Sequence, residues 1–588
     1  MTLPTRGVTL PLELLQAILS CLPTQLHLSI KTLLACSASS RSLRQIALDS
    51  YLWRPHVAAR WRRGKQCTYD DDALQFYRLR SMRDTQVEHD IRTLASTSHG
   101  RIPLIEALRG QGDEVIEALE QLQRLEDFDR PLTWLSERYW AQQAYRCILR
   151  DQAIAVWATI ADETVEQEDS FEKGVWAFVA FRDGVDYRDY LLSYDMVRHP
   201  KLLALLASQR VQGEALLEHV AVSVMSYMRR IGFRAADATS FHDLDNHFLS
   251  HVWSGIDPEA DPSARFESGT LPMSLVSIFC SFVRRLPKEY NIRAKPIGFP
   301  GVMLAGVALG DSADWVMVNV FEGKIAQPSD LQRMLLGMRL EMVMPISRLG
   351  PAPAKTMCGR VAQNILTSVR RGDDDVVQDH YALVSAHYSV ALALYHFAAP
   401  ESRHLYANWA VSVIQAEYPH DVSYLENTLS RVFTGERAET VLRLCREMRD
   451  DDMVGPEPQL GTSRIRWRIG QVFRHRLFGY CGVVRGFDEE CLASEEWIQS
   501  MGVDTLPHGR SQPFYHVIIE GGGTRYVAQE NIGDEEHRSI PFECIENLAG
   551  LSMMGRYFCS MDMDMRGRWR FVKSCETAAM YPETSPTA

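Results

Sequence analysis

The chain lacks any uncharged apolar segment long enough to cross a membrane. A spanning helix needs about 18–20 consecutive, predominantly apolar residues. The N-terminal residues have an apolar rhythm, but Pro11, Glu13 and Pro23 interrupt it, and no basic cluster precedes an apolar core. This pattern is not typical of a secretory signal. We therefore expect no association with a membrane and a location inside the cell, in the cytoplasm, the nucleus or both.

Closely spaced cysteine pairs are also missing. The 588 residues include 12 cysteines, and no two of them form a CxxC pair, the spacing found in many zinc sites and redox motifs. Scattered cysteines in a long chain are typical of reduced thiols in an intracellular protein. The sequence therefore predicts neither a metal centre nor another cofactor.

A surplus of positive charge is absent as well. The chain has 63 Lys and Arg residues against 75 Asp and Glu residues, a formal net charge of −12. Non-specific binding to nucleic acid depends on a positive field, so this composition argues against such binding by the chain as a whole. The hydrophobic content of 46% and the charged content of 23% are ordinary for folded protein.

The length exceeds what one core can hold, and we expect roughly three to five domains.

The N-terminal residues predict a small helical unit. Apolar residues recur at helical spacing over 10–22, and Pro11 suits the first turn, where a missing N–H costs nothing. Further helices are expected over 30–36 and 39–50, with Trp53 closing the unit. About fifty residues bury too little surface to be stable alone. We therefore expect a partner to complete this core, with the start of a larger helical domain as the alternative.

The order of residues in this unit resembles an F-box. Leu-Pro-x-Glu-Leu-Leu-x-x-Ile-Leu is followed by a leucine-rich middle and a late Leu-Trp-Arg, and the resemblance spans residues 8–62. It implies docking on the Skp adaptor of cullin-type ubiquitin ligases. A Leu or Ile side chain fully buried against such a partner contributes ~1.5–3 kcal/mol. The residues to which the resemblance assigns contact with Skp are Pro11, Leu14, Leu15, Ile18, Leu19, Leu22, Leu34 and Trp53.

The middle of the chain changes character once. Residues 63–230 have a helix-rich pattern. Later, a helix entered through a proline over 271–285 is followed by strand-like runs over 292–307, around a Gly-Phe-Pro-Gly turn, and by another strand over 315–320. This order, within residues 231–345, resembles a degenerate transglutaminase-like core.

Active members of that fold place a Cys at the helix start, a His on the next strand and an Asp on the one after. The resemblance assigns these positions to Pro272, Val302 and Asn319. None of the three can act as nucleophile, general base or orienting carboxylate, so we expect no catalysis here. Cys280, two turns into the helix, is expected in the core. A cysteine hydrolase or amide transferase built on this segment is the alternative.

A histidine cluster precedes that core. His247 and His251 are four residues apart and would share a helix face, a spacing that zinc proteins use. No His-Glu-x-x-His motif and no cysteine pair lie nearby. We expect a packed helix with histidines on its polar side, and metal binding as the less favoured alternative.

The last two segments are predicted to be helical hairpins, over 346–460, and a small, strongly bent antiparallel barrel, over 461–588. In the latter, glycines punctuate short runs of β-branched and aromatic residues, and the glycines at 521–523 predict a hairpin turn. This segment resembles the YccV-like, or hemimethylated-DNA-binding, domain. Residues 462–588 hold 14 basic and 17 acidic side chains, whereas a DNA reader usually presents a positive face.

Basic and aromatic side chains make up the candidate binding surface of the barrel. A barrel this small is filled by side chains, so most of its aromatic residues are expected in the core and one or two along a groove. Two kinds of partner stay open, a nucleic acid and a peptide or protein. The candidate residues are Arg474, His475, Arg476, Tyr480, Trp497 and Tyr515.

The segments in this order resemble the F-box only protein twenty-one family in its fungal-type form, with residues 496–515 and 555–558 as the strongest links. The resemblance implies a non-catalytic substrate receptor that reaches a cullin–RING scaffold through Skp. A DNA-associated regulator acting through the C-terminal segment is the alternative. The implied fold is multidomain α+β, with a three-helix F-box (1–62), a helical region (63–230), a degenerate transglutaminase-like core (231–345), helical hairpins (346–460), and a YccV-like β-barrel with a C-terminal tail (461–588).

Overall fold

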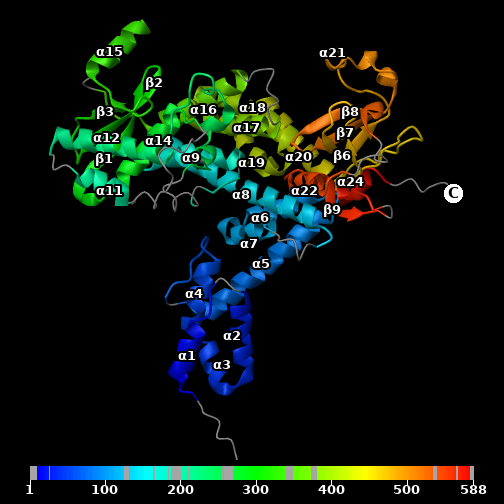
Figure 1. Cartoon of the computed structure of the whole chain (residues 1–588), viewed down its shortest axis with the longest axis horizontal. Coiled ribbons are helices and arrows are strands. Elements are labelled where there is room, and N and C mark those ends of the chain that lie inside the picture. The colour runs from blue at the N-terminus through cyan, green and yellow to red at the C-terminus, as the bar shows by residue number, and fades with distance from the viewer. Residues whose placement is uncertain are drawn as a thin grey trace, which may run out of the picture. The chain divides into compact units, whose positions relative to one another are not determined.

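The chain forms two compact units, one made of residues 1–148 with 449–588 and the other of residues 149–448. Both combine helices with antiparallel strands (Figure 1), so the predicted α+β class is confirmed. Among the described helices, none has the length and apolar character needed to cross a membrane. The computed structural model describes residues 10–24, 27–69, 71–124, 131–162, 166–182, 184–186, 188, 200–208, 212–254, 256, 269–339, 349–371, 380–533, 540–564 and 567–582.

The first unit begins and ends the chain. Its N-terminal part contains α1 (Leu12–Ser20), α2 (His27–Ser39), α3 (Arg41–Ala47), α4 (Ser50–Arg60), α5 (Ala73–Ala95), α6 (Arg101–Arg109), η1 (Gly112–Val115) and α7 (Ile116–Gln123). Its C-terminal part contains β5 (Val472–Arg474), β6 (Cys481–Asp488), α21 (Glu495–Ser500), η8 (Val503–Thr505), η9 (Gly509–Ser511), β7 (Phe514–Ile519), β8 (Thr524–Ala528), η10 (Gln529–Asn531), α22 (Phe542–Gly550), α23 (Met554–Tyr557), β9 (Phe558–Met563), β10 (Trp569–Lys573) and α24 (Cys575–Met580). The helices α8 (Trp134–Asp162) and α20 (Gly435–Val454) contain the boundaries between the units.

The second unit is continuous in sequence. It contains α9 (Ser170–Arg182), α11 (Pro200–Ala207), α12 (Glu214–Ile231), η2 (Leu244–His247), α13 (Leu249–Ser254), α14 (Pro272–Arg284), η3 (Lys288–Tyr290), β1 (Ile292–Phe299), β2 (Val302–Leu309), β3 (Val316–Asn319), β4 (Lys324–Ile325), α15 (Pro328–Gly337), α16 (Ala354–Arg371), α17 (His380–Phe397), η5 (Pro400–Ser402), α18 (Arg403–Glu417), η6 (Pro419–Asp421), α19 (Val422–Asn427) and η7 (Leu429–Val432).

Four helices, α1 to α4, occupy the described part of residues 10–60, where the sequence predicts three. The additional helix arises because Asp49 accepts a hydrogen bond from the backbone N–H of Tyr51 and caps a new helix. Trp53, expected only to close the unit, therefore lies inside α4. Ser40 caps α3 in the same way, by accepting from the N–H of Leu43.

Two buried tryptophans form the centre of this N-terminal bundle. The rings of Trp53 and Trp61 each lie 5.0 Å from the ring of Tyr77 on α5. The indole N–H of Trp53 donates to the carbonyl of Ala47 at 2.7 Å, and that of Trp61 donates to Asp84 at 3.1 Å. Because Tyr77 and Asp84 belong to α5, this helix completes the interior of the bundle.

The C-terminal sheet is an antiparallel meander in the order β5-β6-β7-β8. Alternate residues of each strand point to opposite faces, and both faces are buried. On one face Phe473, Val484 and Val517 pack together. On the other, Val483 and Ile518 pack against α22, α23, β9 and the beginning of α8. The predicted turn at 521–523 is confirmed, since these glycines connect β7 to β8.

The predicted closed barrel is not found. Among the described residues, β5 and β8 form no strand ladder with each other; a single bridge joins His475 to Ile532, beyond the ends of both strands. A closed barrel would enclose one face of the sheet and leave the other face outside. Here helices and the β9–β10 hairpin cover the face that carries Val483 and Ile518. Since the apolar residues on both faces are already buried, closing the sheet into a barrel would bury little further apolar surface.

Gly555 permits one close approach within this unit. A Cβ at this position would lie 1.9 Å from the carbonyl oxygen of Leu135 on α8, which no side chain can tolerate. The hydroxyl of Ser136 donates to the carbonyl of Gly555 at 2.8 Å. The glycine therefore lets α23 pack directly against α8, beside the C-terminal sheet.

In the second unit, the predicted helix and strands between 271 and 320 are confirmed. The helix α14 packs on β1 and β2, and the sheet is antiparallel in the order β1-β2-β3-β4. Elsewhere in this unit, the guanidinium of Arg150 donates to both carboxylate oxygens of Asp421, at 2.8 and 2.9 Å, and the hydroxyl of Tyr388 donates to the same carboxylate at 3.0 Å.

Candidate functional sites

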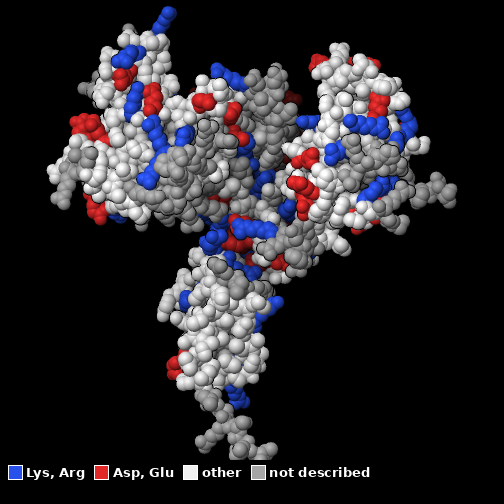
Figure 2. Space-filling model, in the orientation of Figure 1, with Lys and Arg blue, Asp and Glu red and all other residues white. Residues whose placement is uncertain are grey.

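Apolar side chains are exposed on α1 and α2. Leu14 and Ile18 lie one turn apart on α1 and are 47% and 52% exposed. On α2, Leu28 and Leu34 are 69% and 46% exposed. Figure 2 shows few charged side chains on the face of this bundle that is turned toward the viewer. We call the exposed set the N-terminal apolar surface; its members are Leu10, Leu12, Leu14, Ile18, Leu28 and Leu34.

The eight residues assigned to Skp contact divide into two groups. Pro11, Leu14, Ile18 and Leu34 are exposed. The other four lie in the core of the bundle or pack against it, namely Leu15, Leu19, Leu22 and Trp53. The apolar pattern of α1 does not separate the two groups, because α1 is apolar on both sides. Leu10, Leu12 and Leu28 are also exposed, and the resemblance did not assign them.

The candidate surface of the C-terminal segment gathers partly at the connection between β5 and β6. His475 is buried, and its Nδ1 accepts hydrogen bonds from the backbone N–H groups of Leu477 and Phe478, at 3.2 and 3.1 Å. Burial lowers the pKa of His475, which favours the neutral ring that can accept these bonds. In this turn, the side chains of Leu477 and Phe478 are 74% and 71% exposed.

The neighbours of His475 in the candidate list surround this turn. The guanidinium of Arg474 donates to the carbonyl of Gly479 at 3.2 Å, and Arg476 is exposed. The half-buried ring of Tyr480 lies 4.8 Å from that of His475. The structure therefore places Arg474, His475, Arg476 and Tyr480 around one turn.

Tyr515 is not a surface residue, contrary to the prediction. It is 0% exposed, and its hydroxyl accepts from the N–H groups of Arg466 and Trp467 at 3.0 and 3.1 Å while donating to Gln529 at 2.7 Å. Both faces of the sheet are covered, so strand alternation does not expose this ring. Tyr515 instead anchors the segment that leads into β5.

Trp497 packs in a separate cluster. Its half-buried ring on α21 lies 5.7 Å from that of Tyr526. The Tyr526 hydroxyl donates to Asp488 at 2.7 Å, and the same carboxylate pairs with Nε2 of His516 at 3.0 Å. Burial raises the pKa of Tyr526 and lowers that of His516, where it outweighs the attraction of Asp488. The sequence analysis did not single out this trio.

The three positions compared with a catalytic triad lie at element ends. Pro272 begins α14, Val302 begins β2 and Asn319 ends β3. Asn319 is buried, and its side-chain oxygen accepts from the N–H of Glu322 at 3.1 Å. Cys280 is also buried, as expected, and burial raises the pKa of its thiol to about 12. A thiol of this kind is a poor nucleophile at neutral pH.

A cavity of about 340 Å³ adjoins α12 and α14. Its walls are mostly apolar, and the guanidinium of Arg229 at its edge donates to the carbonyl of Glu322 at 2.9 Å. The cavity is lined by Met225, Met228, Arg229, Phe233, Arg234, Ala235, Leu275, Val320 and Phe321.

The predicted single helix carrying both histidines is wrong. His247 ends η2, and His251 lies on α13, because the backbone of Phe248 between them is extended. The Nε2 atom of His247 forms a hydrogen bond with Ser368 at 2.8 Å. Burial lowers the pKa of His247 to about 3, so its ring is neutral at physiological pH.

Two segments match known protein families. Residues 8–57 match the F-box-like family, and residues 465–564 match the family described as hemimethylated DNA-binding protein YccV like. These are the two ends of the chain where the N-terminal apolar surface and the C-terminal sheet lie.

The chain is also similar to three curated relatives that carry the name F-box only protein 21. The one from Pongo abelii is 26% identical over 329 residues, which cover 53% of this chain and 48% of the relative. Those from Mus musculus and Homo sapiens are 35% and 34% identical over 139 residues, 23% of this chain and 20% of each relative. The chain thus spans about half the length, or less, of these relatives. No solved structure matches.

Proposed function

We propose that this protein is the substrate-recognition subunit of a Skp–cullin–F-box ubiquitin ligase. The observation that carries the proposal is the N-terminal apolar surface, which leaves apolar side chains of α1 and α2 in water within the F-box-like segment. A partner that buries one such Leu or Ile completely contributes ~1.5–3 kcal/mol. The Skp adaptor is the partner that an F-box implies.

In this proposal the protein belongs to the F-box only protein twenty-one family, as a fungal-type member with the five segments set out from the sequence. The similarity to relatives of that name supports it. The protein itself catalyses no reaction. It raises the local concentration of a bound substrate protein beside the ubiquitin-loaded enzyme of the cullin–RING scaffold, inside the cell.

The binding of Skp tests the proposal. In the full-length protein, Leu14→Asp with Ile18→Asp places two charges where the adaptor would bury apolar side chains, which costs several kcal/mol. We expect co-purification of the Skp adaptor to be lost, at least ~100-fold in affinity. Leu477→Asp with Phe478→Asp is the matched control, since these side chains are even more exposed but lie outside the F-box-like segment.

The outcome that contradicts the proposal is equal retention of Skp by the wild type and by the Leu14/Ile18 variant. Circular dichroism of that variant separates a loss of binding from a loss of folding. Both side chains are about half exposed in the free chain, so the folded state should tolerate the substitutions.

A DNA-associated regulator is the second candidate, because residues 465–564 match a family described as DNA-binding. Retention of the full-length protein on duplex DNA at increasing salt tests it. Each phosphate contact that is lost reduces the slope of log K against log salt by about 1. The double variant Arg474→Ala with Arg476→Ala should therefore have a slope smaller by about 1 for each arginine, if both contact phosphates. Such a decrease would support the second candidate. Absence of salt-dependent retention of the wild type would reject it.

A further inference from the structure

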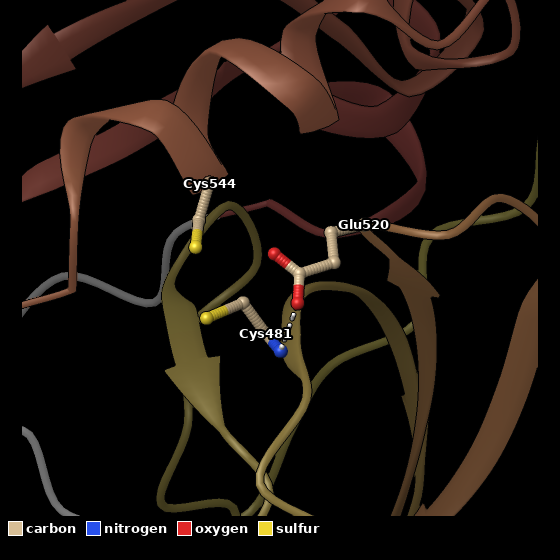
Figure 3. A group of neighbouring side chains, drawn as sticks. All are labelled: Cys481, Glu520 and Cys544. Atoms are coloured by element: carbon tan, nitrogen blue, oxygen red, sulfur yellow. Dashed lines mark hydrogen bonds between the residues drawn. The ribbon is translucent and has the colours of Figure 1, made fainter.

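Three side chains that lie far apart in the sequence meet at one end of the C-terminal sheet. Cys481 is the first residue of β6, Glu520 follows the last residue of β7, and Cys544 lies in the first turn of α22. The two sulfur atoms and a carboxylate oxygen all lie within 4.8 Å of one another. Figure 3 shows the three side chains converging from two strands and a helix.

The backbone holds two of these residues side by side. Gly482 pairs with Ile519 across the β6–β7 ladder, so Cys481 and Glu520 face each other one step further along. The N–H of Glu520 donates to the carbonyl of Cys481 at 3.1 Å, and the N–H of Cys481 points to the Glu520 carboxylate at 3.5 Å. The positions of both side chains are therefore set by the register of the sheet.

The third residue is held by the packing of α22. Ile545 and Leu548 of this helix are buried in the same cluster as Val483 and Ile518 of the sheet. This contact places the first turn of α22, with Cys544, over the end of the ladder at which β6 begins and β7 ends. Donor atoms carried on rigid elements are the arrangement that a preorganised metal site requires.

The donor set selects the kind of metal. Two thiolates and one carboxylate suit zinc, whereas calcium and magnesium take oxygen ligands in larger sets. Tetrahedral zinc, with Zn–S near 2.3 Å and Zn–O near 2.0–2.2 Å, places donor atoms roughly 3.5–3.8 Å apart. Small side-chain rotations reach this spacing from the present separations of up to 4.8 Å.

We propose that Cys481, Glu520 and Cys544 form a zinc-binding site that ties α22 to the end of the β6–β7 ladder. Cys481 is buried, while Glu520 and Cys544 are half-buried, so an ion can enter from the solvent. Three protein ligands leave a fourth position of the tetrahedron for water or another ligand.

The thiol of Cys544 must lose its proton to bind zinc. Burial, together with hydrogen bonds to Glu520 and Cys481, raises the pKa of Cys544 to about 12. Because zinc binds the thiolate form, binding releases protons and grows stronger as pH rises.

Titration of the full-length, metal-free, reduced protein with Co²⁺ alone tests the site, because thiolate ligation of cobalt produces a charge-transfer absorption in the near ultraviolet. We expect this absorption to saturate at one equivalent and to disappear when Zn²⁺ is added. Cys544→Ser should reduce its intensity by about half, since one of two thiolates is lost. Glu520→Gln should keep the absorption and weaken binding at least ~10-fold.

Cys491→Ser is the matched control, because this half-buried cysteine lies in the same family-matched segment but outside the cluster; its titration should equal that of the wild type. Glu520→Gln also keeps both thiols, so a folding defect in a cysteine variant does not decide the result.

Two outcomes would overturn the proposal. One is a titration of the folded wild type that shows no thiolate absorption. The other is the same absorption in Cys481→Ser with Cys544→Ser as in the wild type. If the wild type shows no absorption and mass spectrometry of air-exposed protein finds a Cys481–Cys544 disulfide, the cluster is a thiol pair and not a metal site.

Discussion

The two ends of the chain expose apolar side chains on different kinds of element, mainly on helices at the N-terminal end and mainly in loops at the C-terminal end. In the N-terminal bundle, Leu14, Ile18 and Leu28 remain exposed around a small core centred on Trp53. In the C-terminal segment, both faces of the sheet are buried, and exposed apolar side chains such as Leu477 and Phe478 lie in the turn after β5. The exposed apolar side chains of the first end are the basis of the proposed contact with Skp. In the C-terminal segment, most aromatic side chains are buried in the core. The presence of aromatic residues there is therefore no evidence of a ligand site.

The comparison extends to polar groups. In the N-terminal bundle, Asp84 accepts hydrogen bonds from Trp61 and Arg60, and Arg60 also donates to the hydroxyl of Tyr77. The C-terminal sheet relies on connected polar groups, such as the bonds of Tyr515 to two backbone N–H groups and to Gln529. Substitutions that change apolar volume, a hydroxyl group or a proton test the contacts of the two regions one at a time.

The largest effect is expected for Trp53→Ala. This substitution removes a buried ring from the N-terminal core and should lower the free energy of unfolding by ~3–5 kcal/mol. Ile18→Asp, on the exposed side of the same bundle, should change it by less than ~0.5 kcal/mol. Chemical denaturation monitored by tryptophan fluorescence measures both. If Ile18→Asp were as destabilising as Trp53→Ala, the apolar surface would be part of the fold and the comparison would fail.

A smaller effect is expected for Tyr515→Phe. The change keeps the ring but removes the acceptor of the Trp467 N–H and one of the two acceptors of the Arg466 N–H, which should cost ~1–3 kcal/mol. Tyr69→Phe is the control, since Tyr69 is 88% exposed, and its denaturation midpoint should match that of the wild type. Equal midpoints for both variants would mean that the buried hydroxyl contributes nothing to stability.

The smallest effect concerns pH and the turn after β5. The pKa of His475 is lowered in the folded state, so its stabilising contribution is complete above the unfolded value of about 6.5 and declines as pH falls below it. Protonation would also occupy Nδ1, the acceptor for Leu477 and Phe478. We expect the wild type to lose more stability between pH 7.5 and 5.5 than His475→Asn, whose side-chain oxygen can accept similar bonds without titrating. Identical pH profiles would show that this histidine does not titrate on unfolding.

Local patterns predicted local structure well. The proline-led helix α14, the strands around the Gly-Phe-Pro-Gly turn and the hairpin at the glycines 521–523 all follow from neighbouring residues. The additional helix α4 was not predicted, although the Asp49 side chain caps its first turn. The histidine helix was wrong because the extended Phe248 separates two short helices.

The apolar rhythm of residues 10–22 by itself determined that a helix forms there, since side-chain periodicity and backbone hydrogen bonding are local. Which of its leucines face water was decided only by the tertiary structure, because that depends on where α3, α4 and α5 pack. The same holds for the open sheet, the burial of Tyr515 and the meeting of Cys481, Glu520 and Cys544. Each arises from contacts between residues distant in sequence, whose proximity is set by strand register and helix packing and leaves no spacing pattern in the chain.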